Sequence, residues 1–244
     1  MVAPFKACNL HGSCTIYDYK QQKWLMSDST DANIPSLPAS TFKIINLLIA
    51  LETGVITDEK EVLKWPGTMD TVRYGYRPET YRDLSIQEAF EISAVWVFLD
   101  LAQKIGREHY RHYLTLCQYG NADLSEKDPD FWNRGQLAIS PRNQVEFLVK
   151  MYDGKLPFSK RTIDIVKRVM VTEQTKDYTV RSKTGWTREN GMDSGWWVGY
   201  VERANNLYFF ATRVSKKRSE NHPKFGNCRK EITRNILQQL KVID

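Results

Sequence analysis

In the stretch Pro38-Ala39-Ser40-Thr41-Phe42-Lys43, a serine and a lysine stand three residues apart at the start of an apolar run, Ile44-Ile45-Asn46-Leu47-Leu48-Ile49-Ala50-Leu51. This spacing predicts a helix that carries both side chains on one face. A serine hydroxyl becomes a good nucleophile when a neighbouring base accepts its proton. A lysine in apolar surroundings shifts toward its neutral form and serves as such a base. Because Ser-x-x-Lys is also common at ordinary helix ends, other segments of the chain must show whether this pair is functional.

The bulk composition indicates a soluble globular protein with room for a substantial core. The chain has 244 residues, of which 41% are hydrophobic and 26% charged. No apolar run approaches the ~20 residues of a membrane span, so we expect no membrane partner. The first eight residues lack the continuous apolar stretch of a signal peptide, which is compatible with a start at Met1 that replaces a removed leader.

Basic residues concentrate toward the C-terminal end of a chain whose net charge is +6. They are Arg213, Lys216, Lys217, Arg218, Lys224, Arg229, Lys230 and Arg234. Such a stretch is compatible with nucleic-acid binding. However, no nucleic-acid motif accompanies it, and Glu220 and Glu231 interrupt it. We therefore expect a solvated loop and helix face, and no nucleic-acid partner.

Cysteine and histidine spacings predict no metal centre. The four cysteines are Cys8, Cys14, Cys117 and Cys228, and none has metal-ligand spacing. His109 and His112 lie three apart on a predicted helix, but no third ligand accompanies them. Cys8 and Cys14 are close enough to bridge a short loop, which would suit an oxidising compartment, and two unlinked thiols are an equal alternative.

Short strands are predicted at both ends of the chain, with helices between them. Strand patterns occupy 15–19, 23–26, 178–183, 195–201 and 207–214. Helical patterns occupy 40–54, most of 85–154 and 161–170, and a final amphipathic helix carries Ile232, Ile236, Leu237 and Leu240. We therefore expect an α+β fold, in which an antiparallel sheet formed from both termini is flanked by helices.

The same pattern predicts an inserted, all-helical subdomain within a single domain, 1–244. We expect 1–60 and 160–244 to form the sheet-containing part and 61–159 to form the helical part. A cleft between two such parts is a natural ligand site.

Three further segments carry polar side chains in specific settings. Ser93-Ala94-Val95 lies at the junction of two helical patterns, where Ser93 either protrudes from a turn or caps the second helix. Lys183-Thr184-Gly185 ends a strand-like run, and Tyr119-Gly120-Asn121 is a predicted loop. Each is weak alone. Ser-x-x-Lys, Ser-x-Val and Lys-Thr-Gly in this order, with about 50 and 90 residues between them, form a specific set.

On these residues the chain resembles the class D (oxacillinase-type) serine β-lactamases, which share their fold with the penicillin-binding transpeptidases. The resemblance covers nearly the whole chain. It also includes Leu51-Glu52-Thr53-Gly54-Val55-Ile56, Phe131-Trp132, Gly135-Gln136-Leu137 and Gly195-Trp196-Trp197-Val198-Gly199. Val95 replaces the asparagine of the Ser-Asp-Asn motif, a departure typical of class D.

The resemblance implies hydrolysis of the β-lactam amide of penicillin-type antibiotics, and hence antibiotic resistance, through an acyl-enzyme on Ser40. It implies that Lys43 carries a CO2-derived carbamate as general base, and it implies no other cofactor. The indole N–H of Trp132 would hold that group. Ser93 and Lys183 would relay a proton to the departing ring nitrogen.

The resemblance also implies how the substrate binds. Backbone N–H groups of Ser40 and Trp186 would form the oxyanion hole. Thr184 and Arg229 would bind the substrate carboxylate, although a plain helix-face arginine is the alternative for Arg229. Two further residues expected to line the substrate site are Val95 and Gly185. The partner is then a small-molecule β-lactam, and the enzyme is a periplasmic or secreted monomer or homodimer.

One departure and two alternatives stay open at this point. Asn133 follows Trp132 where the family commonly has leucine, and it would either admit water or offer the carbamate another hydrogen bond. The chain could be the sensor domain of a membrane-bound β-lactam receptor, which stays acylated, although Val95 favours the hydrolase because sensors tend to have a polar residue there. A D,D-peptidase shares the Ser-x-x-Lys and Lys-Thr-Gly elements, but the short length and Trp132 count against it.

Overall fold

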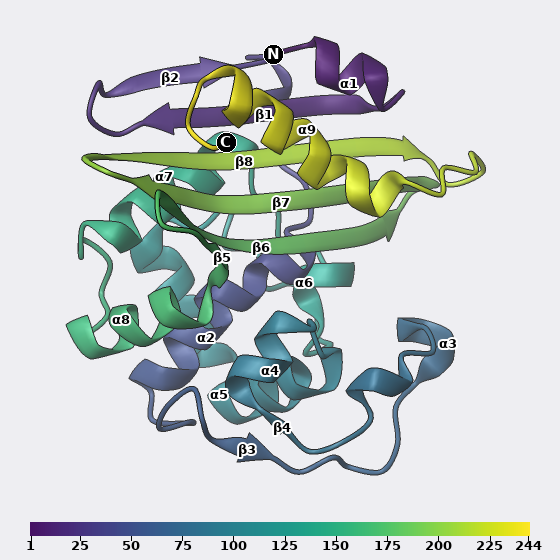
Figure 1. The fold of residues 1–244 in the computed structure, drawn as a ribbon. Helices are drawn as coiled ribbons and strands as arrows, with labels where there is room; N and C mark the ends of the chain where they lie inside the picture. Colours follow the sequence, from purple (N-terminus) through teal and green to yellow (C-terminus); the bar gives the residue numbers. More distant parts are fainter.

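A six-stranded antiparallel sheet organises the computed structural model, which describes residues 1–244 (Figure 1). The strand order is β2-β1-β8-β7-β6-β5. The strands are β1 His11–Asp18, β2 Lys23–Met26, β5 Val171–Gln174, β6 Tyr178–Glu189, β7 Met192–Arg203 and β8 Asn206–Lys217. Pairing of β1 with β8 joins the two ends of the chain, from His11 opposite Ser215 to Asp18 opposite Tyr208. The predicted α+β fold with a sheet from both termini is confirmed.

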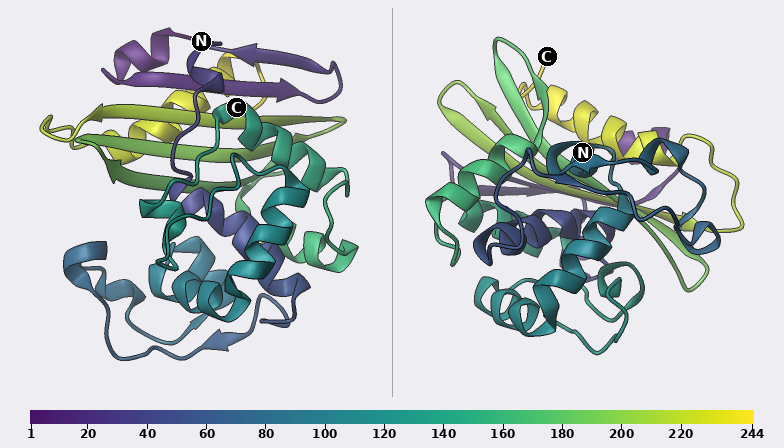
Figure 2. Two further views of the ribbon diagram at one scale, coloured as in Figure 1. Left: turned by 180° about the vertical axis from the view of Figure 1, so that it is seen from behind. Right: turned by 90° about the horizontal axis from the view of Figure 1, so that it is seen from below.

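Helices cover both faces of this sheet (Figures 1 and 2). They are α1 Ala3–Ala7, α2 Lys43–Glu52, α3 Thr71–Tyr74, α4 Ile86–Glu91, α5 Val95–Cys117, α6 Phe131–Arg134, α7 Pro141–Tyr152, α8 Lys160–Val169 and α9 Phe225–Gln239. Short 3₁₀ turns lie at η1 Asp31–Asn33, η2 Ala39–Phe42 and η3 Pro78–Thr80, and β3 Val62–Leu63 pairs with β4 Leu84–Ser85. No helix is both long enough and apolar enough to cross a membrane.

The alternating side chains of the central strand β7 divide the interior into two layers. Trp196, Val198 and Tyr200 pack into the core that contains α2, α5 and α7. Trp197 and Val201 point to the other face, where they pack with α1 and α9. Figure 1 shows α9 crossing one face of the sheet, and the view from behind in Figure 2 shows the helices of the other face. The subdomain boundaries at 60 and 160 stay a prediction.

Most predicted elements are present, with three differences. The loop predicted at 119–121 continues to residue 130, within a region predicted to be mostly helical, and α5 ends before it at Gln118 in a left-handed conformation, φ 53°. Strand β6 continues to Glu189, so the Lys183-Thr184-Gly185 motif lies within the strand and not at its end. The short elements α1 and β5 were not predicted, because five or fewer residues carry too little periodicity.

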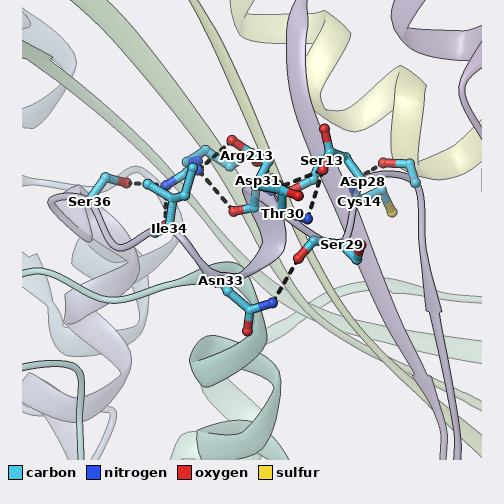
Figure 3. A network of polar contacts seen from close by, with 11 residues as sticks. Ser13, Cys14, Asp28, Ser29, Thr30, Asp31, Asn33, Ile34, Ser36 and Arg213 are labelled. Atoms are coloured by element: carbon cyan, nitrogen blue, oxygen red, sulfur yellow. Dashed lines mark hydrogen bonds and ion pairs between the residues drawn. The ribbon is translucent and has the colours of Figure 1, made fainter.

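The basic stretch is not uniformly a solvated surface. Arg213 on β8 is 6% exposed, and its guanidinium donates to the Asp31 carboxylate (2.6 Å), the Ile34 carbonyl (2.7 Å) and the Ser36 hydroxyl (3.0 Å) (Figure 3). The expectation was wrong for this residue, because its carboxylate partner comes from a segment 182 positions away. The network fixes the segment that leads into η2.

The four cysteines are all free thiols. Cys14 is fully buried in β1, and burial raises the pKa of its thiol to about 12. The proposed short-loop bridge between Cys8 and Cys14 is therefore absent, and the alternative of unlinked thiols describes the structure.

Candidate active site

The Ser40 turn is held in a strained conformation from two sides. Ala39 has φ 50°, a left-handed conformation that costs energy for a residue with a Cβ. The Thr41 hydroxyl donates to the Pro38 carbonyl (2.6 Å) and accepts from the Gln144 amide of α7 (2.8 Å). In a 3₁₀ turn, side chains at i and i+3 eclipse, so Ser40 and Lys43 lie on one side of the chain. Ser40 itself is half-buried and remains accessible.

Lys43 is the first residue of α2 and is 1% exposed. Its Nζ lies 2.9 Å from the carbonyl oxygen and 2.9 Å from the hydroxyl of Ser93, and it lies over the Phe98 ring at 4.8 Å. Burial lowers the pKa of this amine well below its usual value, and the charges of Lys183 and Arg77 lower it further. The amine is therefore held toward its neutral form, in which it accepts protons.

Ser93 faces Lys43 from the junction between α4 and α5. Its φ of 62° is left-handed, and the hydroxyl contacts Lys43 and not a helix end. The N-cap alternative is wrong, because Ala94 occupies the cap position of α5 without a side-chain hydrogen bond. A strained serine that faces a neutral lysine is typical of a functional position.

Trp132 on α6 contributes a buried donor without an acceptor. The side chain is fully buried and stacks on Phe42, the residue before Lys43, with ring centroids 5.0 Å apart. Its Nε1 has no hydrogen-bond partner. An unsatisfied buried N–H costs about 1–3 kcal/mol. An oxygen acceptor such as a carbamate on the Lys43 amine therefore fits this donor set.

Asp130, two residues before Trp132, is a charged group that the sequence analysis did not single out. It is fully buried, and burial raises the pKa of its carboxyl to about 6. Its Oδ1 accepts from the Asn133 side-chain amide at 2.6 Å. Asn133, whose role was left open, thus has its amide nitrogen bound to Asp130. The Asp130 charge opposes the lowering of the Lys43 pKa.

The Lys183-Thr184-Gly185 motif lies on the part of β6 that extends beyond β5. Strand β5 pairs only with Thr179, Val180 and Arg181. Farther along, β6 lies against η2, since a Cβ added at Gly185 would come 3.0 Å from the Pro38 carbonyl oxygen and 3.3 Å from the Ala39 Cβ. Glycine at 185 thus permits the close approach of this strand to the Ser40 turn.

Positive charge lies where β6 approaches the Ser40 turn. Burial lowers the pKa of Lys183 to about 7, and the charges of Arg229 and Arg77 contribute. Thr184 is half-buried, and Trp186 is 40% exposed beside the Arg229 guanidinium, 6.0 Å from its ring centroid. Arg229 Nη1 donates to the Gly185 carbonyl, and burial lowers its pKa to about 10. Arg229 therefore lies beside the motif.

Val95 and Arg77 border a small cavity at the start of α5. Its lining residues are Met69, Tyr74, Gly75, Arg77, Thr80, Tyr81, Val95 and Trp96. The Arg77 guanidinium donates to the Ile92 carbonyl at 2.8 Å. The charge of Arg77 acts on both buried lysines, and no local sequence pattern indicates this.

The Tyr119-Gly120-Asn121 segment has a structural role. Gly120 has φ 56°, and a Cβ at this position would come 2.1 Å from the Ala138 carbonyl oxygen. The Asn121 side chain donates to the Gln136 carbonyl at 2.8 Å. The segment therefore ties the end of α5 to the chain that follows α6.

A different hollow is lined by charged residues from the loop before β3 and from α8. Its residues are Asp58, Glu59, Lys60, Lys160, Arg161, Asp164, Ile165 and Arg168. Two ion pairs, Lys160 with Asp164 and Arg168 with Glu59, already satisfy several of these charges. None of these residues belongs to the set around Ser40, so the hollow is a surface feature.

The arrangement brings a nucleophile, neutral bases and cationic groups together. Lys43 lies beside Ser93, and the turn that carries Ser40 lies beside the part of β6 that extends beyond β5. Arg229 and Lys183 favour an anionic ligand. Of the predicted set, Val95 lines the small cavity that Arg77 also borders. These groups are suited to acyl transfer at a carbonyl carbon of an anionic substrate.

Comparisons with known proteins agree with this geometry. The model of the penicillin-binding protein transpeptidase domain matches residues 12–238. The β-lactamase OXA-5 of Pseudomonas aeruginosa is 37% identical over 98% of this chain and 87% of its own length. The crystal structure of a class D β-lactamase from Sebaldella termitidis is 41% identical, covers 98% of this chain and 95% of that one, and has a TM-score of 0.92.

One relative is a regulatory protein and not an enzyme by name. The regulatory protein BlaR1 of Bacillus licheniformis is 34% identical over 96% of this chain and 38% of its own length. A family match over nearly the full length, with class D enzymes among both the relatives and the solved structures, makes this chain a class D serine β-lactamase of the penicillin-binding transpeptidase family.

Proposed function

We propose that this enzyme hydrolyses penicillin-type β-lactams through an ester on Ser40, with carboxylated Lys43 as general base, and thereby confers antibiotic resistance. The observation that carries the proposal is the Lys43 amine. It is 1% exposed, follows Ser40 by one turn and lies 2.9 Å from the Ser93 hydroxyl. A base with a strongly lowered pKa, one helical turn from the serine, is what acylation of that serine requires.

In the first half of the reaction, Ser40 Oγ attacks the β-lactam carbonyl carbon while the Lys43 side chain accepts its proton. Backbone N–H groups of Ser40 and Trp186 would stabilise the developing oxyanion, and each such donor contributes about 10²–10³ in rate. The close approach of β6 to η2 supports this assignment, because the two N–H groups belong to these two neighbouring segments.

The ring nitrogen leaves as its bond to the carbonyl carbon breaks, and it needs a proton. Ser93 is suited to deliver that proton, because its hydroxyl already contacts Lys43. Lys183, with a pKa of about 7, can hold or release a proton near neutral pH. Arg229 and Thr184 would bind the carboxylate of the substrate, Arg229 as a charged donor at the edge of the site.

In the second half, a water attacks the carbonyl carbon of the Ser40 ester and the Lys43 side chain accepts its proton. The bond from that carbon to Ser40 Oγ then breaks, and the proton returns to the serine oxygen. A CO2-derived carbamate on the Lys43 amine, held by the indole N–H of Trp132, would supply an anionic base in this pocket. The unpartnered Nε1 of Trp132 and the neutral form of the amine support this assignment.

The sensor domain of a β-lactam receptor is a second candidate, favoured by the similarity to BlaR1. Turnover of nitrocefin by the purified chain distinguishes the two. We expect many turnovers per enzyme, whereas a single stoichiometric burst would indicate a sensor or a D,D-peptidase and would contradict the hydrolase. The proposal includes a periplasmic or secreted location, and expression in a susceptible bacterium should raise the inhibitory concentration of penicillins.

A further inference from the structure

Two thiols and a carboxylate from opposite ends of the chain meet outside the active site. Cys8 is the C-cap residue of α1, and Cys228 and Glu231 lie three residues apart on α9. The two sulfur atoms and a carboxylate oxygen of Glu231 all lie within 4.8 Å of one another. Cys8 and Cys228 are 220 positions apart, so spacing along the sequence could not indicate this group, and the expectation of no metal ligands rested on spacing.

The distances suit a single tetrahedral ion. Zinc binds thiolate sulfur at about 2.3 Å and carboxylate oxygen at about 2.0–2.2 Å, so two such ligands are about 3.6–3.8 Å apart. The Cys228 sulfur and the Glu231 Oε2 are 3.9 Å apart. Small side-chain rotations would therefore complete the coordination. A disulfide would require the sulfurs to approach to about 2.05 Å and would give Glu231 no role.

The backbone already holds these residues in position. The Cys8 N–H donates to the Pro4 carbonyl at 3.1 Å, and the Cys8 carbonyl oxygen lies 2.7 Å from His222 Nε2. The Cys228 N–H donates to the Lys224 carbonyl at 2.8 Å. Cys228 is buried, Cys8 is half-buried and Glu231 is exposed, so one side of the group is open to an entering ion and to a water as fourth ligand.

The charges of the three ligands and of a nearby lysine suit a divalent ion. Two thiolates and one carboxylate exceed the charge of a divalent ion by one, and Lys224, the residue before α9, brings a cation to the same turn. We propose that Cys8, Cys228 and Glu231 bind a zinc ion that joins the N-terminal and C-terminal helices.

Titration of the reduced, metal-free full chain with Co²⁺ alone tests the proposal. We expect the thiolate-to-cobalt and visible bands of tetrahedral cobalt at one equivalent, and displacement of cobalt by Zn²⁺. Cys8→Ser and Cys228→Ser should abolish the bands. Glu231→Gln should weaken binding about tenfold or more. Cys117→Ser, which removes a buried thiol outside the group, is the matched control and should bind as the parent does.

A second readout is independent of cobalt. Zinc should raise the melting temperature of the parent chain and not that of Cys8→Ser, because a ligand of the folded state stabilises only a chain that binds it. Cys8→Ser should hydrolyse nitrocefin as the parent does, which separates this inference from the proposed function and shows that the variant folds.

The metal site is overturned if the reduced parent shows no thiolate–cobalt bands, or if the bands persist in both cysteine variants. A Cys8–Cys228 disulfide in the chain isolated without reductant would also overturn it, because the pair would then be an oxidative link.

Discussion

The Lys43 amine lies 2.9 Å from the hydroxyl of Ser93, a serine that has a left-handed backbone conformation with φ 62°. This pair connects the helix that carries the nucleophile to the junction of α4 and α5. Because Lys43 is buried with few polar neighbours, its protonation depends on Ser93 and on the charges of Lys183, Arg77 and Asp130. The chemistry of the enzyme therefore depends on groups from five separate parts of the chain.

Replacement of Lys43 by alanine should separate the two halves of the reaction. Loss of the base should slow both steps, and deacylation by the larger factor, about 10²–10⁴-fold, because the strained β-lactam ring opens more readily than the unstrained Ser40 ester is hydrolysed. The acyl-enzyme should therefore accumulate. Stopped-flow nitrocefin hydrolysis measures both phases. Lys104→Ala, which removes an exposed lysine of α5, is the control and should behave as the parent. Unchanged steady-state turnover of Lys43→Ala would exclude this lysine as the base.

Replacement of Trp132 by phenylalanine tests the proposed carbamate. Phenylalanine keeps the stacking on Phe42 but lacks the indole N–H that has no partner in the structure. The parent should lose activity in CO2-depleted buffer at low pH and regain it with bicarbonate. The variant should need more bicarbonate for the same recovery, and Trp24→Phe, outside the site, should not. Parent activity that is the same with and without CO2 would rule out the carbamate.

Replacement of Arg229 by glutamine should mainly weaken substrate binding. A hydrogen bond to a charged group contributes about 1.5–3 kcal/mol, so KM for a β-lactam with a free carboxylate should rise about 10- to 100-fold. The kcat should change less, because Arg229 lies at the Gly185 carbonyl and not at Ser40. Lys230→Gln, at the neighbouring exposed residue, is the matched control. Equal KM values for the two variants would contradict the role of Arg229.

Replacement of Asp130 by asparagine should change the pH dependence of stability. The pKa of Asp130 rises from 3.8 to about 6 on folding, because burial disfavours the carboxylate. The folded parent therefore holds an extra proton between these values and loses stability as pH rises through about 6. The full effect is of order 3 kcal/mol. Melting temperatures measured at pH 4.5 and 8 check this: the melting temperature of Asp130→Asn relative to that of the parent should be higher at pH 8 than at pH 4.5. An equal difference at both pH values would contradict the burial of an ionised carboxyl.

The sequence predicted the parts of the site that local pattern encodes. The serine and lysine of η2 and α2, the strand of Lys183 and the terminal sheet follow from spacing and periodicity, and the resemblance supplied Trp132 and Arg229. Local pattern could not indicate that Asp130 is buried, since an acidic residue in a polar loop is usually solvated.

Long-range pairing explains the other differences. Arg213 is buried because Asp31, 182 positions earlier, neutralises it, and Cys8 lies beside Cys228 only because β1 pairs with β8. The left-handed conformations of Ala39 and Ser93 are also imposed by the surrounding structure. None of these features has a signature within a short window of sequence.

Mass spectrometry of the intact chain, quenched with acid during reaction with a penicillin, tests directly whether Ser40 forms an ester with the substrate. We expect an adduct of the mass of one intact penicillin on the parent, a larger fraction of it on Lys43→Ala, and none on Ser40→Ala. Hydrolysis with no adduct on either the parent or Lys43→Ala, or an adduct that survives the loss of the Ser40 hydroxyl, would contradict a serine ester as the intermediate.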